Sequence, residues 1–235
     1  MSKTIDQLNS FTNDFITRCF EHPVGMETEL PLEDRQKMAS LFGAVLDTIV
    51  EKSGGKSKWE PSCHFECQGK PMAMVEAEMK KTGARCRLHL HAGSVYLLFS
   101  LPHRQEIPSM DNQFWKLLTA SVVDHNLKYE PYQDFEAIGK NPENKKLSRF
   151  TKSAAFSLLA EFIIGYQHDP DFQKLGKFEK SAFFQETDWQ TIIDQFSPVV
   201  ADFTKLSQAL YRSFYIKTSK TGRLGKPRMP GDLAR

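Results

Sequence analysis

Residues 85–92 carry the feature that most constrains the fold, a strict alternation of polar and apolar side chains. A period of two places successive side chains on opposite faces of a strand. The segment therefore predicts a β-strand with one buried face and one face of basic and ionisable groups. The apolar positions are Cys86, Leu88, Leu90 and Ala92, and the polar ones are Arg85, Arg87, His89 and His91.

A strand needs partners in a sheet, and the neighbouring segments offer two. Residues 95–99 continue beyond Gly93 as an apolar run, either as a second strand or past a bulge. Residues 72–79 either pair antiparallel through a turn at residues 80–83 or form a short helix, since Met, Ala and Glu favour helices. The sequence leaves these alternatives open.

The segments on either side show helical spacing instead. Apolar residues recur there at steps of three and four, which marks one buried stripe per helix. We therefore predict an α+β fold that is mainly helical, with a small β-rich insert at about residues 56–104 and a basic C-terminal tail at 217–235. The insert separates an N-terminal helical segment (1–55) from a C-terminal helical domain (105–216). Helices are expected at residues 4–20, 31–52, 111–122, 146–167 and 189–196, and again from Pro198.

Composition restricts the class of protein. The 235 residues are 40% hydrophobic and 26% charged, which is ordinary for a globular protein and argues against wholesale disorder. The chain has no run of about 18 apolar residues, and residues 1–15 lack the apolar core of a signal peptide. Four cysteines are too few for a disulfide scaffold. We expect a soluble cytoplasmic protein with no membrane partner.

The formal net charge of +2 hides two basic segments. Residues 56–104 hold 8 positive and 4 negative groups, and residues 217–235 hold 6 and 1. The rest of the chain is mildly acidic. Such segregation favours an acidic partner at the two basic segments.

The polar face of residues 85–92 is a candidate nucleic-acid surface. Side chains two residues apart on a strand lie roughly 6.6–7 Å apart, close to the phosphate spacing of an extended backbone, and guanidinium groups can bind phosphate in bidentate fashion. The alternative is an ordinary solvated sheet face. The candidate residues are Lys80, Lys81, Arg85, Arg87, His89 and His91.

The basic tail is a second candidate. Such a segment can lie along phosphates and become ordered on binding, and its Gly and Pro residues oppose a regular element. The alternative is a disordered solubilising end. Acidic lipid is disfavoured, because the tail lacks the aromatic or leucine-rich face of a surface helix. The candidate residues are Lys217, Lys220, Arg223, Lys226 and Arg228.

A zinc site is a third candidate, formed by Cys63, Cys67, Cys86 and His89. Thiolate and imidazole groups suit tetrahedral zinc. However, three residues separate the first two cysteines where the usual zinc knuckle has two, and Cys86 and His89 fall on opposite faces of a single strand. We therefore favour a buried Cys86 beside a solvent-facing His89, and we predict no cofactor, with zinc as the alternative.

No motif identifies an enzyme. The chain has no Gly-x-Ser-x-Gly and no thiol with a clear base. The pairs Asp124-His125 and His168-Asp169 lie near helix ends, where such residues serve as caps. We predict no catalytic activity, and the alternative is an enzyme that uses His89 or His91.

The arrangement of these segments is similar to that of the small large-subunit of type IV CRISPR effector complexes. The similarity lies in the pair Cys63 to Cys67, the following Gly69-Lys70-Pro71, the basic β-segment and the helical C-terminal half, over about residues 60–215. It implies a subunit at the 5′ end of the crRNA that contacts the duplex flanking the protospacer. The cysteine spacing departs from the family's pattern, and no duplex-reading residue carries over.

The leading hypothesis is a non-enzymatic nucleic-acid-binding subunit of a ribonucleoprotein. Its partners would be RNA and/or DNA, held through phosphate contacts, and the protein subunits of a larger complex. The alternative is a helical protein-interaction module, an adaptor or bacterial effector with no nucleic-acid role. Replacement of Arg85 and Arg87 by Glu separates the two hypotheses, because it would leave the binding of a protein partner unchanged.

Overall fold

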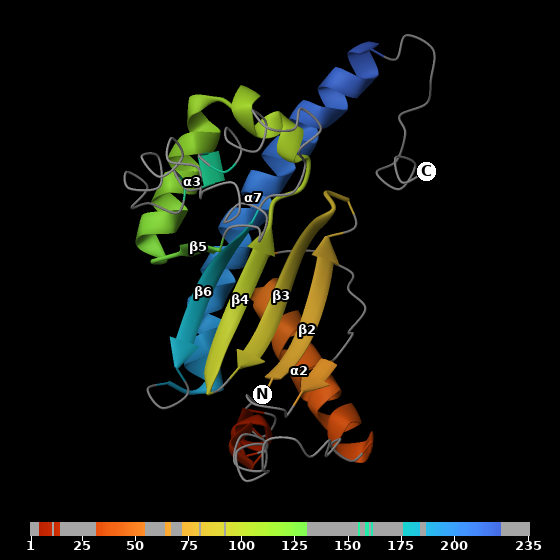
Figure 1. The fold of residues 1–235 in the computed structure, drawn as a ribbon, viewed down its shortest axis with the longest axis vertical. Helices are drawn as coiled ribbons and strands as arrows, with labels where there is room; N and C mark the ends of the chain where they lie inside the picture. Colours follow the sequence, from red (N-terminus) through yellow and green to blue (C-terminus); the bar gives the residue numbers. More distant parts are fainter. Residues whose placement is uncertain are drawn as a thin grey trace, which may run out of the picture. The chain divides into compact units, whose positions relative to one another are not determined.

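The fold was obtained as a computed structural model (Figure 1). It divides into two compact units: unit 1 comprises residues 1–79, 85–99 and 179–201, and unit 2 comprises residues 80–84, 100–178 and 202–235. Each unit combines segments far apart in the sequence, whereas the four predicted domains are each continuous. The structure describes residues 5–10, 12–14, 32–54, 64–66, 72–79, 81–91, 93–130, 155, 158–159, 161, 176–183 and 187–221.

A six-stranded sheet runs in the order β1-β2-β3-β4-β6-β5. The first two strands pair antiparallel, with His64 opposite Met74 and Glu66 opposite Met72. The first four strands follow one another in chain order, but at the far edge β6 lies between β4 and β5. The strands are β1 (His64–Glu66), β2 (Met72–Met79), β3 (Ala84–His91), β4 (Ser94–Ser100), β5 (Lys128–Glu130) and β6 (Lys177–Phe183).

The prediction of a mainly helical chain with its β-structure confined to residues 56–104 is wrong. β5 and β6 come from the segment predicted as a C-terminal helical domain (105–216), and they belong to the same sheet as the insert. Only Phe178 and Ala182 of β6 are buried. With so few apolar positions, the segment shows little period-two pattern in its sequence. It still forms a strand, because strands pair through backbone hydrogen bonds. The fold is mixed α+β.

Two turns at glycine separate the central strands. Gly83 has a φ of 70° and Gly93 a φ of 79°, left-handed conformations that cost a residue with a Cβ roughly 1–2 kcal/mol. Residues 72–79 form a strand rather than a short helix. The apolar run after Gly93 is a second strand rather than a continuation past a bulge.

In unit 1, one face of the sheet is covered by helices. α2 (Leu32–Lys52) and the first part of α7 (Trp189–Thr221) lie on the same side of the sheet (Figure 1). Phe42 of α2 meets Trp189 edge to face, with ring centroids 5.3 Å apart, and the Trp189 indole donates to the Thr12 hydroxyl at 3.3 Å. Burial of one side chain of the size of Phe42 contributes about 1.5–3 kcal/mol, so this contact helps to hold α2 and α7 together within unit 1.

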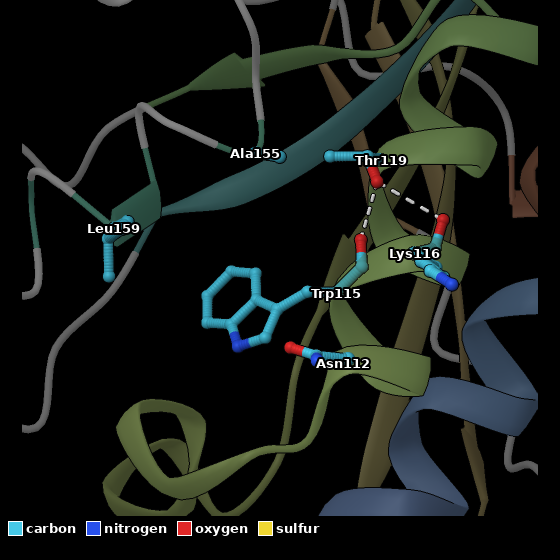
Figure 2. A pocket seen from close by; sticks show the side chains of 6 residues that line it. All are labelled: Asn112, Trp115, Lys116, Thr119, Ala155 and Leu159. Carbon is cyan, nitrogen blue, oxygen red and sulfur yellow. Dashed lines mark hydrogen bonds between the residues drawn. The ribbon is translucent and has the colours of Figure 1, made fainter.

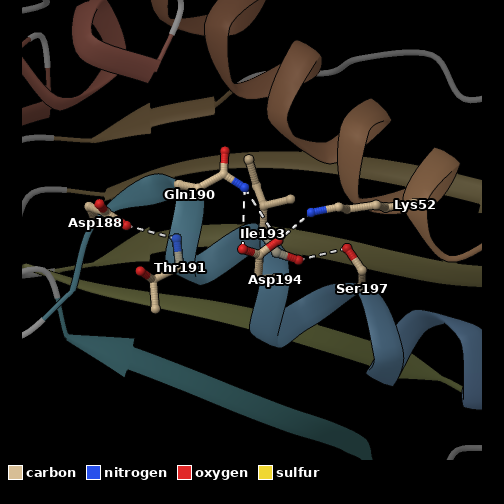
Figure 3. Close-up of polar contacts among 7 residues, drawn as sticks. All are labelled: Lys52, Asp188, Gln190, Thr191, Ile193, Asp194 and Ser197. Carbon is tan, nitrogen blue, oxygen red and sulfur yellow. Dashed lines mark hydrogen bonds and ion pairs between the residues drawn. The ribbon is translucent and has the colours of Figure 1, made fainter. Parts of the chain in front are cut away.

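The first turns of α7 are fixed by polar contacts, which Figure 3 shows. The Asp188 carboxylate accepts a hydrogen bond from the backbone N–H of Thr191 at 2.7 Å. The Asp194 carboxylate pairs with Lys52 of α2 and accepts from the Gln190 amide at 3.3 Å. These contacts define where the helix begins and tie it to α2 within unit 1.

α7 continues through Pro198, so the predicted break after residue 196 is wrong. A proline inside a helix removes one backbone hydrogen bond and costs about 3 kcal/mol. The helix continues because apolar side chains before and after the proline are buried. The buried side chains are Ile192, Ile193, Phe196, Val199 and Val200.

The same helix extends to Thr221, so the prediction of no regular element from Lys217 onward is wrong for residues 217–221. Once a helix has formed, each further residue adds a hydrogen bond without a new nucleus, so a polar segment can extend it. The remainder of the predicted tail lies outside the described residues. Within the described ranges, no helix has both the length and the apolar character needed to cross a bilayer.

In unit 2, the Asp202 carboxylate links α3 (Asn112–Asp124) to the second part of α7. It accepts from the Ser121 hydroxyl at 2.9 Å and lies 3.3 Å from His125 Nε2 and 3.0 Å from Lys205 Nζ. Burial raises the pKa of Asp202, but the hydrogen bonds from Lys205, Ser121 and His125 outweigh it, and the pKa lies below its ordinary value. His125 is also the C-cap residue of α3, as its position near a helix end predicts. A 3-10 helix, η1 (Arg104–Ser109), precedes α3.

Candidate binding face of the sheet

β3 confirms the alternation predicted from its sequence. Cys86, Leu88 and Leu90 are buried, whereas the polar side chains lie on the opposite face, Arg85 exposed and the other three half-buried. This second face belongs to unit 1. We call it the outer face and define it by Glu76 and Glu78 of β2, Arg85, Arg87, His89 and His91 of β3, and Tyr96 of β4.

Both arginines of the outer face are ion-paired. Arg87 Nε and Nη2 donate to Glu76 Oε2 at 3.1 and 2.6 Å, with side-chain exposures of 33% and 26%. Arg85 Nε lies 3.3 Å from Glu78 Oε2, and this pair is more exposed, at 59% and 44%. The predicted row of four cationic or ionisable groups is thus two neutralised arginines followed by two imidazoles. A ligand would meet less positive charge here than the sequence suggests.

An aromatic cluster occupies the other end of the outer face. The rings of His89 and His91 are stacked, with centroids 5.9 Å apart and planes 24° apart. The ring of Tyr96 lies 6.1 Å from that of His89. Three ring side chains from two adjacent strands therefore form a contiguous group, which we call the ring row.

Tyr96 was not among the predicted site residues. Its place beside His89 depends on the turn at Gly93, which brings β4 against β3. The sequence left open whether residues 95–99 formed a second strand. Because Tyr96 lies within an apolar run, the sequence does not show which face of that strand it occupies. A two-strand reading of the segment would have revealed it.

The predicted zinc ligands are not brought together within the described residues. Cys63 and Cys67 lie outside them. Cys86 is buried on the helix-covered face, and burial raises the pKa of its thiol to about 12. His89 lies on the other face. The described part of the chain contains no group of three or more His, Cys, Asp or Glu side chains able to hold a metal ion.

The basic tail is only partly described. Lys217 Nζ lies 2.8 Å from the carboxylate of Glu106 and 2.9 Å from the Ser109 hydroxyl. Glu106 is buried and also accepts from Ser213 at 2.6 Å. Lys217 is therefore committed to a contact within unit 2. Lys81, in the turn between β2 and β3, is exposed. The described residues do not include Lys80, Arg223, Lys226 or Arg228, nor the side chain of Lys220.

Unit 2 contains a separate pocket of about 330 Å³, which Figure 2 shows. Its lining is mostly apolar, and the Trp115 indole forms one wall, packed edge to face on Phe114 at 5.5 Å. Its volume is near the lower end for small-molecule sites. The residues that line it are Asn112, Trp115, Lys116, Thr119, Ala155 and Leu159.

No protein-family model, no curated protein and no solved structure matches this chain. The resemblance to a type IV CRISPR subunit therefore stays a prediction.

Proposed function

We propose that the outer face of unit 1 binds single-stranded nucleic acid, with bases stacked on His89, His91 and Tyr96. The ring row carries this proposal, since its centroids are 5.9 and 6.1 Å apart. Adjacent bases of an extended strand are separated by a similar distance, about 6–7 Å or twice the 3.4 Å rise within a duplex strand. Each base stacked on an aromatic side chain contributes about 1–3 kcal/mol.

The arginines have a secondary part in this proposal. Arg85 is the more exposed of the two, and its pair with Glu78 is the longer, so a phosphate can exchange with the carboxylate there. Arg87 stays bound to Glu76. Stacking then supplies most of the affinity, and binding tolerates different base sequences because every base has a π-face.

The direct test measures the affinity for short single-stranded RNA and DNA by fluorescence anisotropy, with EDTA present. Replacement of His89 and His91 by Ala removes two stacking contacts and is expected to weaken binding about 30-fold, from about 1 kcal/mol per contact. Replacement of His125 by Ala, in unit 2, serves as the histidine control and is expected to change nothing. Failure of the unaltered chain to retain any oligonucleotide at low salt would overturn the proposal.

The same face is compatible with a place in a ribonucleoprotein, where a guide strand would lie over the ring row. We propose this as the setting of the activity, on the resemblance to the CRISPR subunit. Purification of the chain from its native cell and sequencing of the bound RNA tests it. A defined RNA together with further protein subunits is expected, and the absence of both contradicts the proposed setting.

A protein-interaction module is the second candidate function, and exposed apolar residues on α7 favour it. Tyr215 and Ile216 are 43% and 51% exposed. A protein partner held there would be lost on replacement of both residues by Ala and retained when Arg85 and Arg87 become Glu. Nucleic-acid binding at the outer face predicts the opposite pattern.

A further inference from the structure

We propose that Met74, His89 and His91 form a binding site for Cu(I) at the histidine end of the outer face. The two imidazoles come from alternate positions of β3, and the thioether comes from the adjacent strand β2. All three residues belong to unit 1. The proposal does not rest on nucleic-acid binding, since it needs only these side chains.

The register of β2 and β3 brings Met74 beside the histidines. The two strands each have eight residues and are joined by the turn at residues 80–83. Arg85 pairs with Glu78, and Arg87 pairs with Glu76. Two residues forward along β3 therefore correspond to two residues back along β2, as in an antiparallel pair. Two further residues along, Met74 stands opposite His89.

Distances in a sheet allow the three side chains to share one ion. Directly opposed residues have Cβ atoms about 4.5–5.5 Å apart, and alternate residues of one strand are about 6.6–7 Å apart. The ring centroids of His89 and His91 are 5.9 Å apart. Met74 is half-buried, as are both histidines. The proposal requires the ring nitrogens and the sulfur to turn toward a common point by rotation about the side-chain bonds.

The chemistry of this donor set selects copper in its reduced state. Thioether sulfur is a soft ligand that prefers Cu(I), and imidazole also binds copper well. Zinc in proteins takes thiolate, imidazole or carboxylate ligands. The described part of the chain places no Cys, Asp or Glu in a group of three with these histidines. Cys86, the nearest thiol in the strand, points to the helix-covered face and stays protonated, because burial raises its pKa to about 12.

The test is a competition titration of Cu(I) against a chromophoric chelator, under argon with ascorbate. The full chain carries Cys19→Ser, Cys63→Ser and Cys67→Ser in every sample, so that these three thiols do not compete for the ion. We expect a single ion per chain. Met74→Leu keeps the size and apolar character of the side chain and is expected to weaken binding at least about tenfold, the lower end of the loss reported for outer partners of metal ligands.

Matched variants separate a ligand role from a structural one. Met79→Leu makes the same change at the far end of β2 and is expected to bind Cu(I) like the parent. His89→Phe and His91→Phe keep a ring and remove the nitrogens, so each is expected to lose copper. Far-UV circular dichroism verifies the fold of each variant.

Three results would overturn the copper site. They are no chelator-competitive binding by the parent, equal affinities for Met74→Leu and Met79→Leu, and unchanged copper binding in His91→Phe. None of these depends on whether the outer face binds nucleic acid. Conversely, a chain that binds copper but no oligonucleotide would retain the site and reject the proposed function.

Discussion

The ion pair between Arg87 and Glu76 makes a quantitative prediction about charge on the outer face. Glu76→Gln removes one negative charge and keeps the length of the side chain. The Arg87 guanidinium, held at 2.6 Å from the carboxylate in the native chain, then becomes available to a phosphate. If single-stranded nucleic acid lies over the outer face, this variant binds it more tightly than the native chain.

The size of the gain follows from counterion release. For a single strand, one additional phosphate contact makes the negative slope of log affinity against log salt steeper by about 0.7. Relative to 1 M salt, this gives a gain of about 0.9 log units in affinity at 50 mM salt, or about eightfold. The substitution also costs stability. The pair is about one-third exposed on the arginine side, and an ion pair of this kind contributes about 1 kcal/mol at most.

The assay is fluorescence anisotropy with a labelled single strand across a range of salt concentrations. Glu33→Gln is the matched control, because Glu33 is exposed on α2, the helix that covers the opposite face of the sheet. It changes the net charge equally and is expected to leave the slope unaltered. An unchanged slope for Glu76→Gln, with the fold intact, would show that Arg87 does not meet the ligand.

Three further predictions concern stability and reactivity. Because the pKa of Asp202 is lowered in the folded chain, its carboxylate stabilises the fold fully above the ordinary Asp pKa of about 4. This stabilisation is lost as the pH falls through the lower pKa of the folded state. The urea midpoints of the native chain and of Asp202→Asn should therefore converge in acid. Cys86, whose burial raises the thiol pKa to about 12, should react with iodoacetamide at pH 8 only as fast as the chain unfolds, as followed by mass spectrometry. Gly93→Ala, at a φ of 79°, should cost roughly 1–2 kcal/mol of unfolding free energy in a urea titration.

The spacing of apolar residues along the chain correctly predicted the elements that depend on local sequence. The faces of β3 follow directly from the alternation of residues 85–92, and α2 and α3 follow from their apolar stripes and end signals. Pro198 misled the prediction, because a proline is a local signal while the burial of Phe196 and Val199 that carries the helix past it is tertiary.

The sequence predicts where the polar face of β3 lies but not which side chains of the neighbouring strands share it. Glu76 and Glu78 neutralise the arginines, and Tyr96 extends the ring row, only because β2 and β4 flank β3. Strand order and register depend on long-range pairing, so a surface read as cationic became one of rings and ion pairs.

The most direct test of the stacking claim compares two double variants of the histidine pair. His89→Phe with His91→Phe keeps two ring faces on β3 and removes every ionisable nitrogen there, whereas His89→Ala with His91→Ala removes the rings as well. Stacking predicts that the Phe variant binds single-stranded nucleic acid within about threefold of the native chain, while the Ala variant loses about 30-fold. Equal losses in the two variants would contradict stacking as the basis of binding.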